Sequence, residues 1–377
     1  MKIVSIVNTN YSLSFDDRVN KVGRTLIQLG HAIDLIALET KNERSQGVTD
    51  YGASFQTESL ISRKYFSSGK FIPLKFLEWN LRILMLLFFK KWDVIWVNDY
   101  DGISAILYGR IIKLVFPKKK IIWDHHELVP NGFLNSIFYR WLIYSCDIIP
   151  HANSDRVIYT KSKLPNKYSS KFVVLENYPD KNFAQMQKKH VDDDFHLWLA
   201  GSEYCLYQGA ALTYRKVMEC IEAIYAIDDL KLIIMGPCDE QTHSLIEQRW
   251  PNYREKVFIT GWIPQSSFFS YMDEALVSIV FYENIDTNHW LCAPNRFYSA
   301  ILRGIPIICG PNPPMKRVIE EDGLGEICFK NGEDYKEITV CIKKVRKNHG
   351  EYRRNCLLAR NKFVWENQEA LFKKILE

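Results

Sequence analysis

Short apolar runs, each of the length of a β-strand, alternate with helix-length segments along most of this 377-residue chain. In the first half the runs lie at residues 3–7, 32–38, 94–97, 120–123, 148–149 and 172–175. Helical periodicity fills the gaps at residues 19–29, 102–115 and 133–144. Buried apolar strands joined by helices form parallel sheets, so the pattern predicts an α/β fold with helices on both faces of the sheet.

The alternation stops at a polar segment, residues 176–194, and then begins again. The later strand-like runs lie at residues 196–200, 232–235, 257–260, 275–281 and 305–309. A chain of this length exceeds the size at which one core stops growing. We therefore predict two doubly wound, Rossmann-like domains, over residues 1–178 and 179–363, with a final helix in 364–377 that packs back on the first. We expect the carboxyl ends of the two sheets to face a cleft, where ligands of such sheets bind.

The amino-acid composition is that of a globular protein rather than a disordered or nucleic-acid-binding one. Hydrophobic residues make up 47% and charged residues 25%, and the net charge of +5 is spread along the chain. The nine cysteines include no C-x-x-C pair and no metal-ligand spacing, which favours reduced thiols in a cytoplasmic protein and no structural zinc. The N-terminus MKIVSIVNTN has no signal-peptide pattern, and we expect it to form a first strand.

The longest apolar stretch, residues 71–92, is interrupted by polar side chains: Lys75, Glu78, Asn80 and Arg82. Its uninterrupted part is too short to span a bilayer. Two interpretations stay open, an ordinary packing helix and a helix that also touches the inner face of the cell membrane. The basic clusters at residues 90–91 and 118–120 suit an anionic membrane surface, and they equally suit solvated helix ends.

One segment, APNRFYSAILRGIPIICG at residues 293–310, has the pattern of an anion-binding corner. Pro294 suits the first turn of a helix, so we expect a short helix from Asn295. The unbonded N–H groups at such a helix start attract phosphate. Arg296 adds a positive guanidinium beside them. From Gly304 the chain is expected to return as a buried parallel strand.

A helix start follows the first predicted strand and carries two charged residues. Asp17 is expected to cap this helix, and Arg18 lies in its first turn. The helix dipole disfavours a cation at that end. We therefore expect a bound anion or a carboxylate partner for Arg18.

Polar residues also follow two later strands of the N-terminal domain. Asn98 and Asp99 come after the strand at 94–97, and the next strand ends in DHHELVP, which contains His126 and Glu127. The carboxyl ends of neighbouring parallel strands meet at one edge of a sheet. A general base or a hydrogen-bonding group for a hydroxyl-bearing substrate fits these residues, and a metal site is the alternative.

Glycines mark the strand ends of the predicted C-terminal domain. Gly201 and Gly209 border the loop after the strand at 196–200, and a helix is expected from about residue 210. Gly236 and Gly261 follow two later strands. Glycine lets the backbone approach a ligand closely, although a plain strand-ending turn also accounts for each position.

Taken together, these segments resemble GT-B glycosyltransferases of the large retaining family 4. The similarity covers nearly the whole length, and the matching segments are DDRVNKVGRTLIQLGH, DHHELVP, the linker at 176–177, the loop 201–209, MGPCDE, the turn at 261–262, APNRFYSAILRGIPII and FVWENQEALF. Each segment alone is a weak signal, whereas the ordered set is specific. The resemblance implies a donor nucleotide in the C-terminal domain and an acceptor in the N-terminal domain.

The resemblance also implies roles for individual residues. His126 matches the family histidine that lies near the transferred sugar, and Glu127 follows it as in many relatives. Pro294, Asn295 and Arg296 match a Pro-Asn-Lys motif whose cation faces the donor diphosphate. Arginine keeps the charge of lysine and adds a bidentate geometry.

Three features depart from the family pattern. Ser299 stands where relatives place a glutamate that holds the nucleotide ribose, and Leu291 stands where the first glutamate of their paired motif falls. Gln208 precedes the loop glycine where relatives have Lys or Arg, and Arg215 is the nearest downstream cation. A serine cannot form the charge-assisted pair that a carboxylate offers to two ribose hydroxyls, which implies weaker donor binding or a different donor.

We therefore predict a glycosyltransferase that moves a sugar from a nucleotide-sugar to a glycan or lipid-linked acceptor in bacterial-type surface polysaccharide assembly. The resemblance implies retention of configuration, and neither a metal nor a cofactor is expected because the nucleotide-sugar is a substrate. The predicted site residues are catalytic His126, Glu127 and Asp99, donor-binding Gly201, Gly209, Arg215, Gly236, Pro294, Asn295, Arg296, Phe297 and Ser299, and acceptor-binding Asp17, Arg18 and Asn98. The alternatives are a sugar-nucleotide epimerase of the same fold and a catalytically silent glycan- or nucleotide-binding partner of another transferase.

Overall fold

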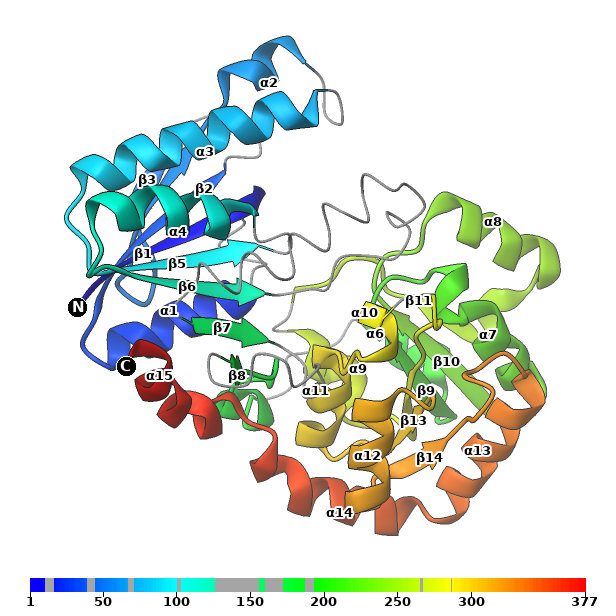
Figure 1. Ribbon diagram of the computed structural model, residues 1–377. Helices are drawn as coiled ribbons and strands as arrows, with labels where there is room; N and C mark the ends of the chain where they lie inside the picture. Colours follow the sequence, from blue (N-terminus) through cyan, green and yellow to red (C-terminus); the bar gives the residue numbers. More distant parts are fainter. Residues whose placement is uncertain are drawn as a thin grey trace. The chain divides into compact units, whose positions relative to one another are not determined.

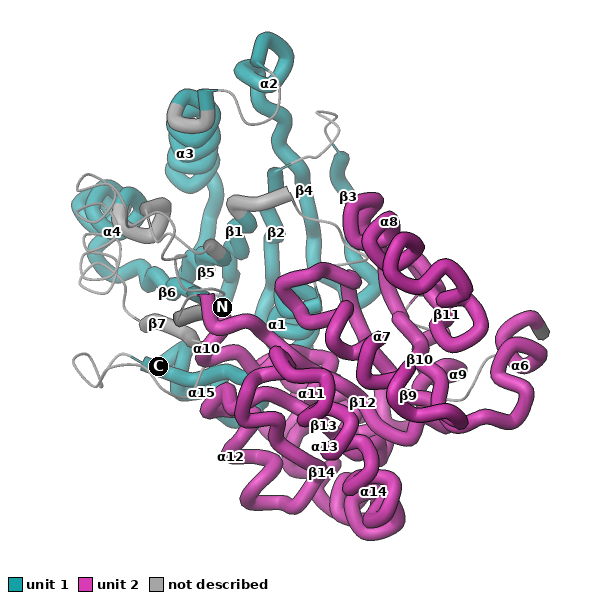
Figure 2. Tube along the Cα trace, turned by 90° about the vertical axis from the view of Figure 1, so that its right-hand side faces the viewer, with its two compact units in different colours: residues 1–176, 368–377 teal, residues 177–367 magenta. Residues whose placement is uncertain are grey.

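The computed structural model divides into two compact units, which are coloured separately in Figure 2. Unit 1 comprises Met1–Glu176 and Gln368–Glu377, and unit 2 comprises Asn177–Asn367. The structure describes residues 1–10, 17–38, 45–66, 71–99, 103–125, 156–159, 172–186, 193–264, 267–285 and 287–377. Each unit is built on its own sheet, so each is described by itself.

Unit 1 contains an eight-stranded sheet with the order β3-β4-β2-β1-β5-β6-β7-β8. Its strands are β1 (Lys2–Asn10), β2 (Ala32–Leu38), β3 (Gln46–Val48), β4 (Ser54–Glu58), β5 (Val94–Asp99), β6 (Lys120–His125), β7 (Arg156–Tyr159) and β8 (Phe172–Val174). All neighbouring pairs are parallel except β3 with β4. The predicted runs at 148–149 and 133–144 lie outside the described residues.

Helices cover both faces of this sheet (Figure 1). They are α1 (Asp17–Gln28), α2 (Ile61–Tyr65), α3 (Ile72–Phe89), α4 (Ile103–Val115) and α15 (Glu369–Leu376). α3 and α4 pack together on one face, where Trp79 and Tyr108 share a core with Ile95 and Val97 of β5. Side chains alternate along a strand, so Trp96 points to the other face, where the Phe372 ring of α15 stacks 6.0 Å from it.

The apolar stretch at 71–92 forms α3, with Pro73 in its first turn. Within the described parts of the chain, no helix is long and apolar enough to cross a bilayer.

Unit 2 contains a six-stranded parallel sheet with the order β11-β10-β9-β12-β13-β14. Its strands are β9 (Glu203–Gln208), β10 (Leu230–Met235), β11 (Val257–Ile259), β12 (Val277–Val280), β13 (Ile307–Cys309) and β14 (Gly325–Ile327). The α-helices described in this unit are α6 (Asp193–Leu199), α7 (Val217–Tyr225), α8 (Glu240–Arg249), α9 (Phe268–Met272), α10 (Thr287–Trp290), α11 (Asn295–Arg303), α12 (Pro313–Asp322), α13 (Tyr335–Lys347) and α14 (His349–Ala359).

Two separate apolar cores lie on the two faces of this sheet. One contains Ile301 of α11, Met315 of α12 and Cys356 of α14. The other contains Ile221 of α7 and Ile342 of α13. Both units are therefore three-layered α/β structures, as the alternating sequence pattern predicts.

Two local predictions in unit 2 are wrong. The run at 196–200 belongs to helix α6 rather than to a strand, because Phe195 and Leu199 pack against the core four residues apart. The first strand of the unit is instead β9, and the helix expected from residue 210 begins only at Val217. A 3-10 turn, η4 (Thr213–Arg215), and a left-handed Lys216 fill the interval.

Candidate functional site

The order of strands in unit 2 marks one position on its sheet as the place where a ligand binds. β9 is the first strand of this sheet and lies between β10 and β12. The next strands in the chain, β10 and β11, lie on one side of β9, whereas β12, β13 and β14 lie on its other side. The crevice outside the carboxyl ends of two such strands is the usual ligand site of a doubly wound sheet. Here those ends are Gln208 of β9 and Phe281, which directly follows β12.

Arg296 joins these two strand ends. It lies in the first turn of α11, after Pro294 at the N-cap. Its Nη1 donates to the carbonyl oxygen of Gln208, and its Nη2 donates to that of Phe281 at 3.2 Å. The side chain is only 6% exposed. The predicted cation therefore lies between the carboxyl ends of β9 and β12, where the strand order reverses, which we call the switch point of the sheet. Two of its N–H groups donate to main-chain carbonyls.

A second guanidinium lies beside the first. A Cβ added to Gly209 would be 3.2 Å from Nη1 of Arg296 and 3.6 Å from Nη1 of Arg215. The Tyr282 ring lies 4.9 Å from Cζ of Arg296 and 5.4 Å from Cζ of Arg215. Such cation–π contacts stabilise a positive charge without neutralising it.

Neither arginine forms an ion pair with a carboxylate in the described parts of the chain. Two cations this close to one loop repel one another and favour an anion between or beside them. Guanidinium groups bind phosphate with two parallel hydrogen bonds. Arg215 and Arg296 together with Gly209 thus form a candidate phosphate site, which we call the arginine site.

Glycine is required in the backbone of this site. Gly209 and Gly236 have φ angles of 111° and 152°, a region that other residues rarely adopt. The Gly209 N–H donates to the Met235 carbonyl at 2.9 Å, and a Cβ on Gly236 would lie 2.4 Å from the Gly209 oxygen. The loops that follow β9 and β10 are therefore in direct main-chain contact.

Lys216 is a residue of this region that the sequence analysis missed. It has a φ of 61° at the start of α7 and is 7% exposed. Its Nζ lies 3.3 Å from Glu283 and 3.8 Å from Glu333. Its position next to Arg215 was the only sequence signal for it, and the left-handed backbone that buries it is visible only in the structure.

Two predicted donor residues do not lie in the arginine site. Gly201 precedes β9, so it lies at the amino end of that strand, whereas the site is at the carboxyl end. Its φ of 78° serves to end α6. Phe297 is fully buried in the apolar core beneath α11. Ser299 lies one turn further along α11 and is 5% exposed.

In unit 1, Arg18 has the carboxylate partner that its position in the helix suggested. Its Nε and Nη2 donate to Oδ1 of Asp124 at 3.2 and 2.9 Å, and Nη1 donates to the Leu175 carbonyl at 2.9 Å. Trp96 Nε1 donates to the other oxygen of this carboxylate at 3.3 Å. Asp124 is fully buried, so this is an internal ion pair that ties α1 to β6.

Of the other predicted residues of unit 1, Asn98 and Asp99 lie at the end of β5 and Asp17 at the start of α1. The Asn98 side chain donates to Ser5 Oγ and to the Ile6 carbonyl, each at 3.0 Å, and so links β5 to β1. Asp99 lies opposite His125 in the β5–β6 register. Asp17 forms an ion pair with Lys21 in the first turn of α1.

His126 and Glu127, which were predicted to be catalytic, lie outside the described residues.

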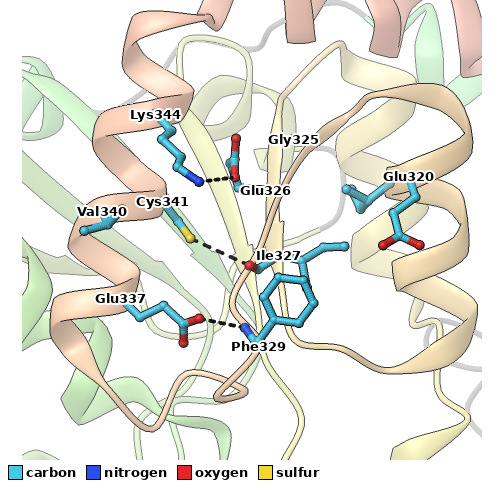
Figure 3. A pocket seen from close by; sticks show the side chains of 10 residues that line it. Glu320, Gly325, Glu326, Ile327, Phe329, Glu337, Val340, Cys341 and Lys344 are labelled. Atoms are coloured by element: carbon cyan, nitrogen blue, oxygen red, sulfur yellow. Dashed lines mark hydrogen bonds and ion pairs between the residues drawn. The ribbon is translucent and has the colours of Figure 1, made fainter.

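A pocket of about 360 Å³ lies elsewhere in unit 2, beside edge strand β14 (Figure 3). Its polar side chains have partners within the protein, and Glu320 pairs with Lys316 outside the pocket at 3.6 Å. Lys344 Nζ lies 3.4 Å from Glu326, and Glu337 accepts a hydrogen bond from the Phe329 N–H at 2.8 Å. It contains none of the predicted site residues, so we assign it no role.

No protein-family model matches this chain, and no curated protein matches it. Solved structures match over its full length. Sucrose-phosphate synthase from Thermosynechococcus elongatus is 14% identical, with a TM-score of 0.74 over 100% of this chain and 98% of the other. The catalytic domain of starch synthase IV from Arabidopsis thaliana, bound to ADP and acarbose, is 13% identical, with a TM-score of 0.71 over 99% and 98%.

Anabaena Alr3699/HepE, solved in complex with UDP, is 12% identical, with a TM-score of 0.68 over 100% of this chain and 99% of the other. The chain therefore has the two-unit, Rossmann-like fold of GT-B glycosyltransferases.

Proposed function

We propose that the protein is a glycosyltransferase that uses a nucleotide-sugar donor. The observation that carries this proposal is the arginine site, in which two guanidinium groups without a carboxylate partner among the described residues flank a glycine at the switch point of unit 2. Structures with this fold were solved with UDP or ADP, which supports a nucleoside diphosphate as the ligand class. We assign the donor diphosphate to this site.

The proposed donor site keeps most of the residues that the sequence singled out. Arg296 is held by two carbonyl groups, so it acts as a fixed positive charge, while Arg215 is half-buried and contacts the phosphate oxygens. The remaining members are Gly209, Gly236, Pro294, Asn295 and Ser299. Preorganised cations stabilise the negative charge that develops on a leaving diphosphate, and this is where they contribute most to the rate.

In the proposed reaction, the bond between the anomeric carbon and the diphosphate oxygen breaks. An acceptor hydroxyl oxygen bonds to that carbon, and its proton passes to the departing diphosphate oxygen. We assign His126, Glu127 and Asp99 to the region around the transferred sugar, and Asp17 and Asn98 to the acceptor side. Retention of configuration and independence of metal rest on the family resemblance.

We further propose a glycan or lipid-linked acceptor and a role in surface polysaccharide assembly, in the cytoplasm at the inner face of the membrane. The eight cysteines that the structure describes are all free thiols, which suits a reducing compartment.

The proposed activity is tested with a panel of nucleotide-sugars incubated with and without glycan and lipid-linked acceptors, while nucleotide release is followed. Release that depends on the acceptor supports the transferase. Conversion of the donor sugar without an acceptor would identify an epimerase instead. Binding without turnover, unchanged in a His126→Ala variant, would identify a silent binding partner.

A further inference from the structure

The positive charge of this chain is concentrated in two segments of unit 1. Residues 71–92 and 103–120 contain nine basic residues and one acidic residue, whereas the rest of the chain contains 40 basic and 43 acidic residues. These segments are the helices α3 and α4 with the residues that follow them. The net positive charge of the protein therefore belongs to one pair of packed helices.

The outer face of α3 is apolar. Five large hydrophobic residues spaced three or four apart lie along it with exposures between 39% and 57%: Leu74, Leu77, Leu81, Met85 and Phe88. The opposite face packs Trp79, Ile83 and Leu87 against the sheet. Since α3 is apolar on both faces, packing against its own unit accounts for only one of them. The exposed stripe is about 21 Å long at the rise of an α-helix.

The neighbouring helix extends this surface. On α4, Ile111, Leu114 and Val115 are exposed by 37%, 85% and 54%. The two helices meet at their carboxyl ends, where the rings of Phe88 and Phe116 lie 6.0 Å apart. Figure 1 shows α3 and α4 next to one another on one face of the unit 1 sheet.

A basic pocket lies at this junction. It has a volume of about 450 Å³ and is lined by Lys2, Lys90, Lys91 and Lys119, with Asp93 as its one acidic residue. Lys119 lies 3.6 Å from Asp93 and Lys90 lies 3.8 Å from Asp34. Lys91 is exposed and has no ion pair with a described residue.

We propose that the outer face of α3 and α4 docks on an anionic membrane surface. An apolar stripe bordered by lysines is the composition of helices that lie in the membrane interface, with their apolar face among the acyl chains. Long lysine side chains then reach the headgroup phosphates, and the basic pocket would take one such headgroup. A second copy of the chain fits less well, because a two-fold interface would set the same basic residues against one another.

The test is flotation of the purified full-length protein with vesicles of phosphatidylcholine alone or of phosphatidylcholine mixed with phosphatidylglycerol. No donor or acceptor is present, so the outcome does not depend on the proposed transferase activity. We expect the protein to bind the mixed vesicles and to bind the neutral ones at least about tenfold more weakly.

Two double variants divide the surface into its parts. Leu81→Gln with Met85→Gln removes the middle of the apolar stripe, and Lys91→Glu with Lys118→Glu reverses two exposed charges. Each is expected to weaken binding to the mixed vesicles by about tenfold or more. Thermal unfolding by circular dichroism checks that each variant folds, and the two pairs test the surface independently.

Matched controls carry the same changes in unit 2, where exposed leucines and lysines are also available: Leu197→Gln with Leu358→Gln, and Lys343→Glu with Lys347→Glu. They should bind as the wild type does. The proposal is overturned if the wild type does not bind mixed vesicles. It is also overturned if the two double variants of unit 1 bind them as tightly as the wild type does. Self-association of the wild type that Leu81→Gln with Met85→Gln abolishes would overturn it in favour of a second copy.

Discussion

At the scale of single residues, the charge of the arginine site depends on what surrounds it. Burial raises the pKa of the Tyr282 phenol, against the opposing effect of Arg296, so this ring stays neutral at neutral pH. The Tyr207 ring, 5.7 Å from Cζ of Arg296, is also buried, and its pKa is raised as well. Neither phenol neutralises the arginines, which leaves the site positive for an anionic ligand.

Arg215→Met tests the phosphate role of the less buried arginine. Methionine keeps much of the side-chain length and removes the charge. We expect the affinity for nucleoside diphosphates, measured by titration calorimetry, to fall by about tenfold or more, since a charge-assisted phosphate contact is lost. Arg354→Met, at an exposed arginine of α14, is the control and should leave the affinity unchanged. If Arg215→Met and Arg354→Met bind nucleoside diphosphates equally well, Arg215 does not contact the donor.

Gly236→Ala tests the main-chain contact between the two loops. The new Cβ would collide with the Gly209 oxygen, and alanine is strained at this φ. We expect the free energy of unfolding to fall by about 2 kcal/mol and nucleotide binding to weaken, because the loop that carries Gly209 must move. Gly350→Ala, at a helical position with open space around its Cβ, should keep or raise the stability. A Gly236→Ala protein with native stability and affinity would contradict this view of the site.

Of the site, the sequence could indicate residue types but not their partners. The helix start at Pro294 and the cation at Arg296 were predicted from local rules. That Arg296 donates to the ends of β9 and β12 depends on which strands are neighbours, which no local pattern contains. For the same reason the sequence could not show that Phe297 points into the core while Arg296 points to the strand ends.

At the scale of elements, two apolar runs that were both predicted to be strands had different outcomes. The run predicted at 32–38 is β2, Ala32–Leu38, in which the four consecutive residues from Leu35 to Leu38 are all buried. The run at 196–200 was also predicted to be a strand, yet it lies in α6. Phe195 and Leu199, four residues apart, pack against the same core, which fits the repeat of a helix and not that of a strand. Short apolar runs do not distinguish a strand from one helical turn.

The short helix α2 depends on a carboxylate from the neighbouring helix α3. Glu78 accepts hydrogen bonds from the N–H groups of Ile61 at 2.7 Å and Ser62 at 2.8 Å, and from Arg82 Nε at 3.0 Å. Burial alone would raise the pKa of this carboxyl, but the hydrogen bonds from Ser62, Ile61 and Arg82 outweigh it and lower the pKa.

We therefore expect Glu78→Gln to reduce the free energy of unfolding by about 1 kcal/mol at neutral pH, as the loss of a helix cap does. Because the pKa of Glu78 is lower in the folded state, its carboxylate stabilises the folded protein at pH values above the ordinary pKa of glutamate. This stabilisation is lost as the pH falls through the pKa that Glu78 has in the folded protein. The difference between wild type and variant should thus disappear in the acid range, as followed by urea unfolding. The control Glu321→Gln, at an exposed residue of α12, should show no such pH-dependent difference.

At the scale of the whole molecule, each unit has its own sheet and its own cores, and the proposed tasks divide between them. Unit 2 contains the arginine site, which we assign to the donor. Unit 1 contains the basic and apolar face of α3 and α4, which we assign to the membrane. A lipid-linked acceptor would connect the two assignments, because such an acceptor is found where that face docks.

The central claim is transfer of a sugar from a nucleotide-sugar, and the most direct measurement counts both products. The wild-type protein is incubated with the donor found in the nucleotide-sugar panel and with a glycan or lipid-linked acceptor. Mass spectrometry then measures the glycosylated acceptor, while chromatography measures the released nucleoside diphosphate. We predict that the two products form one for one, and that Arg215→Met slows both. Release of nucleotide without any glycosylated acceptor, or no release with any donor, would contradict the account.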